Sequence, residues 1–458
     1  MNSNSIYDNK EQLLSHGDVK LRDDLLQIVE SGILKVIPYQ STKELIHNTE
    51  DALLIGESTY PWKGINNIYF VGVGKGSFPI AKALDEILGK QIKEGVVIVK
   101  EGEKRLLNNI EVFESSHPIP DERSIIGADM ILNILQKAKE GDIVFAAITG
   151  GSSALVNKPA EGISISDLQE TNKMLLKCGA EIGKVNAVRK HLCMIKGGRV
   201  VQYGQPATVI TLTLDTAPPD MPWPDMCLPD PTTFQDAISV LKSYNLWDKV
   251  SSAIQQRLLF GLQHPEEETL KTLDGMKHVL FSVGDPPSAC TAAAEKAAEL
   301  GYTPYILSTI MEGEARDVGI VLAGIVNEIV KYGRPFATPC ALISGGETTV
   351  TISGEHGMGG PNQETALAFA NKLRTTEGVA FLSMDTDGTD GPCQIAGGII
   401  DSQTMKRIMA LGINLNNELQ KHNSSEVLHL LNDDIATGHT GTNVMNLRVA
   451  ILSNTRKE

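Results

Sequence analysis

Three aspartates near the C-terminal end of the chain could do chemistry. Asp385, Asp387 and Asp390 lie within six residues, among glycines, directly after the apolar run VAFLSM. Such carboxylates suit Mg²⁺, which takes one or two of them together with waters and phosphate oxygens, and they also offer a general base. An EF-hand does not fit because its downstream glutamate and loop spacing are absent. A plain polar turn is the remaining alternative.

A lysine in a glycine-rich loop is the second candidate. Gly72-Val73-Gly74-Lys75-Gly76-Ser77 follows an apolar run and precedes a helical pattern. A lysine placed there can neutralise phosphoryl oxygens as charge develops. The loop is not a Walker A motif, and a dinucleotide fingerprint would need glycine where Ser77 stands, although Glu101 could then serve as the ribose ligand. A tight turn with a solvated lysine is the simpler alternative.

Further glycine loops also follow apolar runs, where backbone N–H groups and a helix N-terminus can meet an anion. In the segment 149–154, Gly151, Ser152 and Ser153 could bind a carboxylate or phosphate, or simply begin a capped helix. Later in the chain, Gly345, Gly346 and Glu347 follow another apolar run, and Asn362 lies in a Gly-Gly-Pro-Asn segment that opens a helix.

The segment 186–199 is basic in an otherwise acidic protein. Four cations fall within eleven residues: Arg189, Lys190, Lys196 and Arg199. We expect Arg189 and Lys196 to share a helix face, since they are seven residues apart. This pattern predicts an anion-receptive wall, with a solvated basic face as the alternative.

The elements that must position these loops alternate between short β-rich runs and helical patterns, which is typical of α/β layers. We expect strands near 66–74, 95–100, 142–149, 207–214, 278–284, 304–310, 340–345, 379–384 and 445–452. Helices are expected after the first strand and near 124–138, 166–182, 185–196, 288–300, 314–331, 362–373 and 402–410.

The pattern predicts two doubly wound, Rossmann-like, three-layer α/β domains, residues 1–275 and 276–458, with the active site in the cleft between them. The charged stretch 262–275 is a candidate linker. Six prolines within 217–231 exclude regular structure there and predict a long functional loop. Strand order cannot be read from the sequence.

The composition of the chain limits the classes of partner that we expect. The chain has 458 residues and a net charge of −15, which argues against nucleic acid as a partner. Six scattered cysteines, without a C-x-x-C pair, argue against zinc and disulfides. The polar N-terminus has no apolar signal region and no stretch is long enough to span a membrane, so we expect no membrane association and a cytoplasmic location. The oligomeric state is left open, a homodimer included.

Seven sequence blocks in order resemble the class II glycerate 2-kinases, the family whose C-terminal part is the MOFRL domain. They are VGVGKGSFPIAKAL, SSHPIPDERSIIGA, ITGGSSALVNKPAEGIS, NAVRKHLCMIKGGR, ISGGETTVTISG, GGPNQETALAFA and DTDGTDGPCQIAGGIID. The resemblance implies ATP-dependent phosphorylation of D-glycerate, a small hydroxy acid, at its 2-hydroxyl to give 2-phosphoglycerate. From the aspartates we expect Mg²⁺ as cofactor, held near Asp387 with help from Asp385 or Asp390.

Residue roles follow from the same resemblance. Lys75 is similar to the family's loop lysine at the phosphoryl-transfer site, and Asp387 to its active-site aspartate. Asp215 resembles the aspartate of the family's Ser-Asp-Val segment, and Ser152 and Ser153 fall in its glycine-serine loop. The general base is left open between Asp215 and the aspartates at 385–390.

Two departures bear on the substrate. Many family members carry arginine where this chain has Pro361, and proline cannot grip a carboxylate or phosphate. A proline-rich segment, with Trp223 and Met226, replaces the family's Gly-Asp…Ser-Gly-Pro stretch. The alternatives to glycerate kinase are a kinase for another sugar acid or hydroxy acid, a hydroxypyruvate reductase, and a metabolite sensor without activity.

Overall fold

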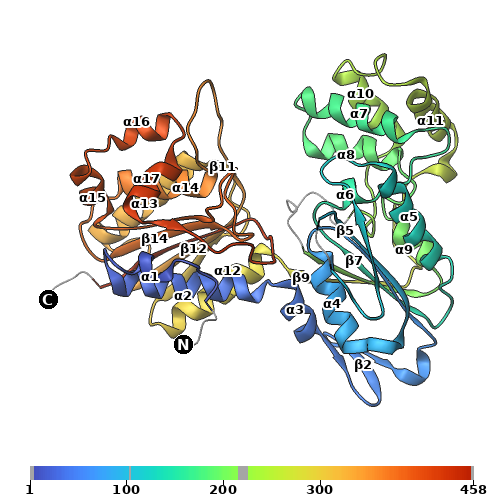
Figure 1. The fold of residues 1–458 in the computed structure, drawn as a ribbon, viewed down its shortest axis with the longest axis horizontal. Coiled ribbons are helices and arrows are strands. Elements are labelled where there is room, and N and C mark those ends of the chain that lie inside the picture. The colour runs from blue at the N-terminus through green and yellow to red at the C-terminus, as the bar shows by residue number, and fades with distance from the viewer. Residues whose placement is uncertain (1–4, 103–104, 215–224, 455–458) are drawn as a thin grey trace. The chain divides into compact units, whose positions relative to one another are not determined.

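The chain folds into two compact units. A computed structural model describes residues 5–102, 105–214 and 225–454. Unit 1 joins the described residues through Ile37 to those from Gly284 onward, and unit 2 runs from Pro38 to Val283 (Figure 1). The sequence domains 1–275 and 276–458 stay a prediction. The compact units differ from them because the N-terminal helices pack with the C-terminal part of the chain.

Unit 2 is built on a six-stranded sheet with the order β6-β5-β4-β7-β8-β9. Its strands are β4 (Ile68–Val73), β5 (Ile92–Lys100), β6 (Glu111–Ser115), β7 (Ile143–Ile148), β8 (Thr208–Leu214) and β9 (His278–Gly284). Pairing from β6 through β8 is parallel. In chain order this is the 3-2-1-4-5-6 arrangement of dinucleotide-binding folds, whose topological switch point lies between β4 and β7.

Helices cover both faces of this sheet. β4 and β7 are buried throughout, as strands between two helical layers must be. Side chains of α5 (Glu122–Leu135) and α9 (Arg199–Gly204) pack on Val71, Val144 and their neighbours on one face. α4 (Ser77–Leu88) packs against β4, β5 and β7 from the other face.

Unit 2 also carries a helical group with a core of its own. It consists of α7 (Ile165–Lys177), α8 (Ile182–His191), α10 (Phe234–Ser243) and α11 (Ser252–Gln263) (Figure 1). The remaining elements of unit 2 are α3 (Pro38–Leu45), β1 (Ile46–Asn48), β2 (Ala52–Ile55), β3 (Ser58–Pro61), η1 (Trp62–Gly64), η2 (Gly89–Gln91), α6 (Ser152–Leu155) and η3 (Pro265–Glu267).

The charged stretch 262–275, expected to be a linker, instead lies inside unit 2. Thr269 is buried, and its hydroxyl donates to Asp230 Oδ2 at 3.0 Å. The next expected strand, β9, is the edge strand of the unit 2 sheet. Composition could not reveal this because polar residues in a linker and polar residues that bond a buried aspartate look alike in sequence.

Unit 1 has a mixed six-stranded sheet with the order β10-β12-β17-β14-β15-β16. The strands are β10 (Thr303–Ser308), β12 (Cys340–Gly346), β14 (Val379–Asp385), β15 (Gly397–Asp401), β16 (Asp434–Ile435) and β17 (Asn446–Leu452). β17 runs antiparallel between β12 and β14, so the carboxyl ends of β12 and β14 lie at the same edge as the amino end of β17.

Unit 1 is also a three-layer sandwich. α2 (Val19–Lys35) and α12 (Pro286–Glu299) cover one sheet face, while α13 (Ala315–Tyr332) and α14 (Pro361–Lys372) cover the other (Figure 1). Buried ion pairs from Arg22 to Asp401 (2.6 Å) and Asp433 (2.8 Å) hold α2 in place. The smaller elements are α1 (Lys10–Leu13), β11 (Gly313–Glu314), β13 (Thr348–Thr349), α15 (Thr404–Ala410), α16 (Leu415–Gln420) and α17 (Ser424–Leu431).

The prediction of two three-layer α/β units is confirmed. Among the described residues, no helix combines the length and the hydropathy that crossing a bilayer requires.

Candidate active site

The lysine loop lies at the switch point of unit 2. The backbone N–H of Lys75 donates to Gly150 O at 2.8 Å, and that of Gly76 donates to Thr149 Oγ1 at 3.0 Å. The loops after β4 and β7 are therefore joined, with the Lys75 side chain exposed at the carboxyl end of the sheet. Ligands of open α/β sheets bind at this place.

Gly74 makes this joining possible. Its φ is +124°, and a Cβ built on it would lie 2.5 Å from Thr149 O. Any other residue would push the two loops apart, since real Cβ atoms do not approach backbone oxygens so closely. Gly74 is therefore required by the geometry of the loop that carries Lys75.

His117, which the sequence reasoning did not single out, lies at the same place. It follows β6, and its ring Nε2 lies 3.3 Å from a Cβ position built on Gly151, as does Cγ of Lys75. Burial first, then the charges of Lys75 and Lys100, lower the pKa of His117 below its ordinary value. A histidine immediately after a β-rich run was the available sequence signal.

The glycine-serine loop contains a buried side chain that has no hydrogen-bond partner among the described residues. Ser152 Oγ is fully buried and makes no hydrogen bond. Ser153 is half-buried, and its carbonyl accepts hydrogen bonds from Asn157 Nδ2 (3.0 Å) and Lys196 Nζ (3.2 Å). An orphaned buried hydroxyl of this kind calls for an explanation, and a ligand group or water would supply one.

The basic segment proves to be neither a wall of four cations nor a solvated face. Lys190, Lys196 and Arg199 are buried. Lys190 pairs with Asp230 at 3.4 Å, and Arg199 donates to backbone carbonyls. Arg189 remains half-buried, with Nε donating to Asn172 Oδ1 at 2.8 Å. Three of the four charges thus serve the packing of unit 2, which residue spacing alone does not reveal.

The predicted catalytic residue Asp215 lies outside the described residues, as does Trp223. The described end of the proline-rich segment contains Asp225, which is 4% exposed and whose Oδ1 has no hydrogen-bond partner. Burial of Arg189 lowers the pKa of its guanidinium, and the nearby Asp225 charge opposes that shift.

In unit 1, three strand ends meet at one edge of the sheet. Asn446 lies opposite Gly346 on β12 and opposite Asp385 on β14. Gly346 has a φ of +108°, and a Cβ there would lie 2.2 Å from Met311 N, so the turn leading to Glu347 needs glycine. Burial first raises the pKa of Glu347, and the Asp390 and Asp387 charges add to this while Arg448 opposes it.

The aspartate loop after β14 contains two carboxylates close together. The backbone N–H of Asp387 donates to Asp385 Oδ1 at 3.0 Å. Burial, and then the charge of Asp387, raise the pKa of Asp385 well above its ordinary value. Asp387 itself accepts hydrogen bonds from Thr389 Oγ1 (2.7 Å) and Asn443 Nδ2 (3.1 Å).

Asp390 holds the start of α14. Its Oδ1 accepts from the backbone N–H and Nδ2 of Asn362, and its Oδ2 accepts from the backbone N–H and Nε2 of Gln363. Pro361 precedes them at the first helical turn, where its missing N–H costs nothing. Both carboxylate oxygens of Asp390 are occupied, and so are those of Asp387, whose Oδ1 accepts from Thr389 and whose Oδ2 accepts from Asn443. Oδ2 of Asp385 is then the carboxylate oxygen of the loop without a hydrogen bond to another described residue.

Arg448 is a second residue that sequence reasoning missed. It lies on β17, fully buried, and its Nη2 donates to Thr348 Oγ1 at 2.7 Å. Nε and Nη1 have no partner, nor has the neighbouring Asn446 Nδ2. Burial lowers the pKa of Arg448 to about 10, against the opposing charges of Glu347, Asp390 and Asp385. A lone arginine in an apolar strand was the available signal.

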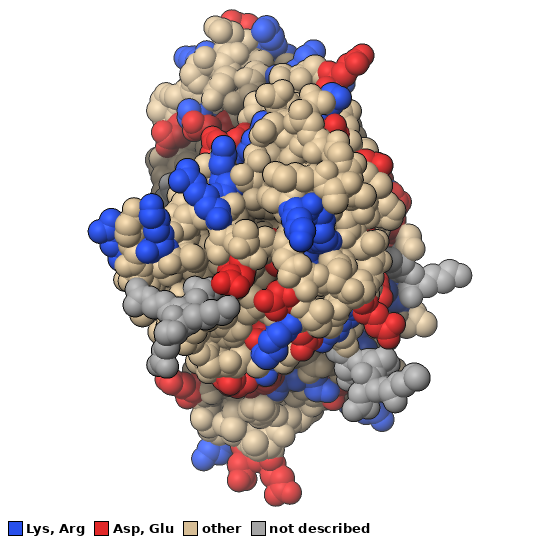
Figure 2. Space-filling model, turned by 90° about the vertical axis from the view of Figure 1, so that its left-hand side faces the viewer, with Lys and Arg blue, Asp and Glu red and all other residues tan. Residues whose placement is uncertain are grey.

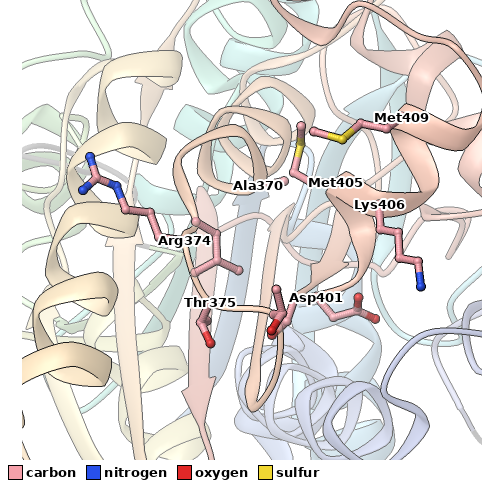
Figure 3. A pocket seen from close by; sticks show the side chains of 10 residues that line it. Ala370, Arg374, Thr375, Asp401, Met405, Lys406 and Met409 are labelled. Atoms are coloured by element: carbon pink, nitrogen blue, oxygen red, sulfur yellow. The ribbon is translucent and has the colours of Figure 1, made fainter.

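A cavity of about 280 Å³ in unit 1 is not part of this site. Asp401 and Ser402, at the carboxyl end of β15, line it, and this end lies at the opposite edge of the sheet from Asp385. Its apolar lining residues are Ala370, Leu373, Met405 and Met409, and the side chains of Arg374 and Lys406 point away from one another (Figure 3). On the face shown in Figure 2, basic and acidic side chains lie among one another, separated by wide neutral areas.

Comparison with known proteins agrees with the two-part layout. Residues 24–259 match the model of a domain of unknown function (DUF4147), and residues 340–446 match the MOFRL family. A Pyrococcus horikoshii protein named glycerate 2-kinase is 39% identical and aligns over 95% of this chain and 98% of its own. An Agrobacterium vitis protein, provisionally named hydroxypyruvate reductase, is 36% identical over 83% of this chain and 98% of its own.

A comparison with solved structures also finds a glycerate kinase. The crystal structure of glycerate kinase from Thermotoga maritima superposes with a TM-score of 0.84 at 34% identity, covering 94% of this chain and 99% of that one. The joined loops of unit 2, the strand-end cluster of unit 1 and near-full-length relatives lead to one conclusion: the chain belongs to the glycerate 2-kinase family, in which a DUF4147 part precedes a MOFRL part.

Proposed function

We propose that this protein transfers the γ-phosphoryl group of ATP to the 2-hydroxyl of D-glycerate, giving 2-phosphoglycerate and ADP. The observation that carries the proposal is the exposed Lys75 at the switch point of unit 2, on a loop bonded to Gly150 and Thr149. A fixed cation at a strand-end crevice can stabilise the charge that grows on a transferring phosphoryl group. The family relatives named as glycerate kinases supply the substrate.

In this proposal the edge of unit 2 receives anionic groups. Gly74 and Gly151 permit close approach of backbone N–H groups, and the orphaned hydroxyl of Ser152 supplies a donor, with Ser153 beside it. Arg189 takes a carboxylate. Its Nε is held by Asn172, and no hydrogen bond within the described part of the chain engages its two η nitrogens.

The edge of unit 1 supplies the remaining groups. Gly345 and Gly346 form a turn against Met311, which carries Glu347. Asn362, predicted to bind substrate or phosphate, is instead buried at the start of α14, with its amide bonded to Asp390 and Asn446. The meeting of these groups with Lys75 in one cleft stays a prediction, as does the cytoplasmic location. The general base stays open at this stage between Asp215 and the aspartates at 385–390.

Mg²⁺ is the cofactor of this proposal, and Asp385 and Asp387 suit it. Burial first, and then the charge of the approaching Asp387 carboxylate, raise the pKa of Asp385, and a divalent cation would relieve the repulsion between the two carboxylates. Within the described ranges no three His, Cys, Asp or Glu side chains surround a common metal position. That fits a cation bound by one or two carboxylates and completed by phosphate oxygens and water. Bound there, it would neutralise charge on the nucleotide phosphates.

The deciding experiment is product analysis after incubation with ATP, Mg²⁺ and D-glycerate, with 2-phosphoglycerate resolved from 3-phosphoglycerate. Formation of 2-phosphoglycerate with stoichiometric ADP is expected. Because Pro361 replaces a common arginine of the family, a panel of other small hydroxy acids should be assayed in parallel. Faster turnover of another hydroxy acid would transfer the proposal to that substrate. Nucleotide binding without any turnover would contradict enzymatic function.

A hydroxypyruvate reductase is the second candidate, favoured by the name of the Agrobacterium vitis relative and by the strand order of unit 2. Against it, Ser77 occupies the third glycine position of the fingerprint, and its buried Oγ donates to Gly74 O at 2.7 Å. Glu101, the expected ribose ligand, pairs with Arg123 at 2.5 Å. Oxidation of NADH or NADPH by hydroxypyruvate in the presence of the enzyme would support the reductase.

A further inference from the structure

We propose that His117 accepts the proton of the substrate hydroxyl during phosphoryl transfer. This inference rests on the kinase function proposed above. It names a third candidate for the base, on unit 2 and close to Lys75, where Asp215 and the aspartates at 385–390 were considered before.

The position of His117 is the first argument. β6 pairs in parallel with β5, and β5 with β4, so the residues that follow these strands leave the sheet at the same edge. His117 follows β6, Lys75 follows β4, and both side chains lie against Gly151, which follows β7. A hydroxyl that attacks a phosphoryl group held by Lys75 would therefore be within reach of the imidazole.

The imidazole of His117 is also available to accept a proton. His117 is half-buried, and no hydrogen bond or ion pair to another described residue engages either ring nitrogen. A histidine kept for structure usually has its ring nitrogens satisfied. His191 of the same unit shows this pattern, since its ring nitrogens lie 2.6 Å from Ala187 O and 3.1 Å from Glu268 Oε2.

The charges around the ring of His117 favour its neutral form. The charged groups that act on His117 are Lys75, from the loop after β4, and Lys100, at the end of β5. Burial first, and then the two lysines, disfavour the imidazolium, so the pKa of His117 lies below its ordinary value and the neutral ring is favoured. A neutral imidazole can take up a proton, whereas an imidazolium cannot.

The step balances. The 2-hydroxyl proton moves to the free imidazole nitrogen as the hydroxyl oxygen forms a bond to the γ-phosphorus, while the bond between that phosphorus and the β,γ-bridging oxygen breaks and its electron pair leaves with ADP. The imidazolium then loses its proton to water, and the neighbouring lysines favour that loss. Lys75 stabilises the phosphoryl oxygens throughout.

The test is the pH dependence of kcat for wild type and His117→Gln between pH 5 and 9, with D-glycerate and ATP saturating. In wild type, kcat should fall at low pH with an apparent pKa below 6.5. In His117→Gln, kcat should be lower by about 10²-fold or more, and that limb should vanish, while KM for glycerate changes little. Comparison with the variant removes the effect of nucleotide ionisation, which both proteins share.

Two controls separate the possible outcomes. His47→Gln alters an exposed histidine of β1 and should leave rate and profile unchanged. His117→Ala should regain activity when imidazole is added, which a purely structural residue would not show. An unchanged kcat or an unchanged low-pH limb in His117→Gln, or failure of imidazole rescue in a folded His117→Ala, would overturn the inference while wild-type kinase activity still stands. Absence of that wild-type activity would instead contradict the proposed function.

Discussion

Asn362 donates both its backbone N–H and its side-chain amide to the same carboxylate oxygen, Oδ1 of Asp390, at 3.0 Å each. Asp390 thereby acts as a built-in anion at the N-terminus of α14, where helix N–H groups lack partners. The amide of Asn362 also donates to Asn446 Oδ1 at 2.6 Å, so the contact connects α14 to the strand-end cluster of unit 1.

Replacing Asp390 should therefore damage the fold before it damages chemistry. In Asp390→Asn, an NH₂ group faces two of the four donors, and buried donors without partners cost about 1–3 kcal/mol each. We expect the free energy of unfolding to fall by about 3 kcal/mol, as measured by urea unfolding. Glu355→Gln, at an exposed loop position, is the control and should change stability by less than about 0.5 kcal/mol. A stable but inactive Asp390→Asn would contradict the anchoring role.

Replacing Arg448, in contrast, should reduce activity before it reduces stability. Its guanidinium is fully buried and leaves two nitrogens without partners, and burying a charged group whose hydrogen bonds are incomplete costs free energy. In Arg448→Met, removal of the two unpartnered nitrogens opposes the loss of a positive charge near Glu347, Asp390 and Asp385, so the free energy of unfolding should change by no more than about 2 kcal/mol. Its kcat/KM should fall by about tenfold or more, since the charge that faces Glu347 and Asp385 is lost. Arg374→Met, at an exposed position of the same unit, is the matched control.

Strong destabilisation of Arg448→Met would show instead that the guanidinium holds unit 1 together through its bond to Thr348. The two measurements, urea unfolding and steady-state kinetics on the same preparation, distinguish these outcomes.

Lys75→Ala tests the proposed phosphoryl-transfer site. We expect kcat to fall by about 10²–10³-fold, the range for removing one electrostatic donor, while the circular dichroism spectrum and the melting temperature stay unchanged because the side chain is exposed. Lys63→Ala removes another exposed lysine of unit 2 and should keep full activity. Full activity of Lys75→Ala itself would refute the role of this lysine.

His278 should make unit 2 less stable in acid. Burial lowers the pKa of His278, whose Nε2 lies 2.9 Å from Thr211 Oγ1. The unfolded chain then binds more protons than the folded one as pH falls below about 6.5, so stability is fully present above that pH and is lost below it. The contribution is at most about 1.4 kcal/mol per pH unit. Urea unfolding at pH 7.5 and 5.5 should give a smaller difference for His278→Gln than for wild type or for His47→Gln.

Much of the fold could be predicted from the sequence because helical and strand periodicity is local. The C-terminal ends of three strands, at Val73, Ile148 and Leu214, were expected within about one residue of where they occur. The small sheet β1–β3 and the strands β6 and β15 were not expected, since strands this short carry little apolar pattern of their own. The antiparallel course of β17 and the packing of α2 with residues far along the chain depend on long-range contacts that local patterns do not encode.

The sequence by itself determined the glycine loops, the lysine and the aspartates that such chemistry needs, because residue type and spacing limit which backbone turns and charges can occur. Only the tertiary structure decided which charges are available. It buries Lys190, Lys196 and Arg199 in packing, occupies Asp390 with α14, and brings His117 beside Lys75 at one sheet edge. The physical reason is that availability depends on burial and on partners distant in the chain, and neither is a property of a residue's neighbours in sequence.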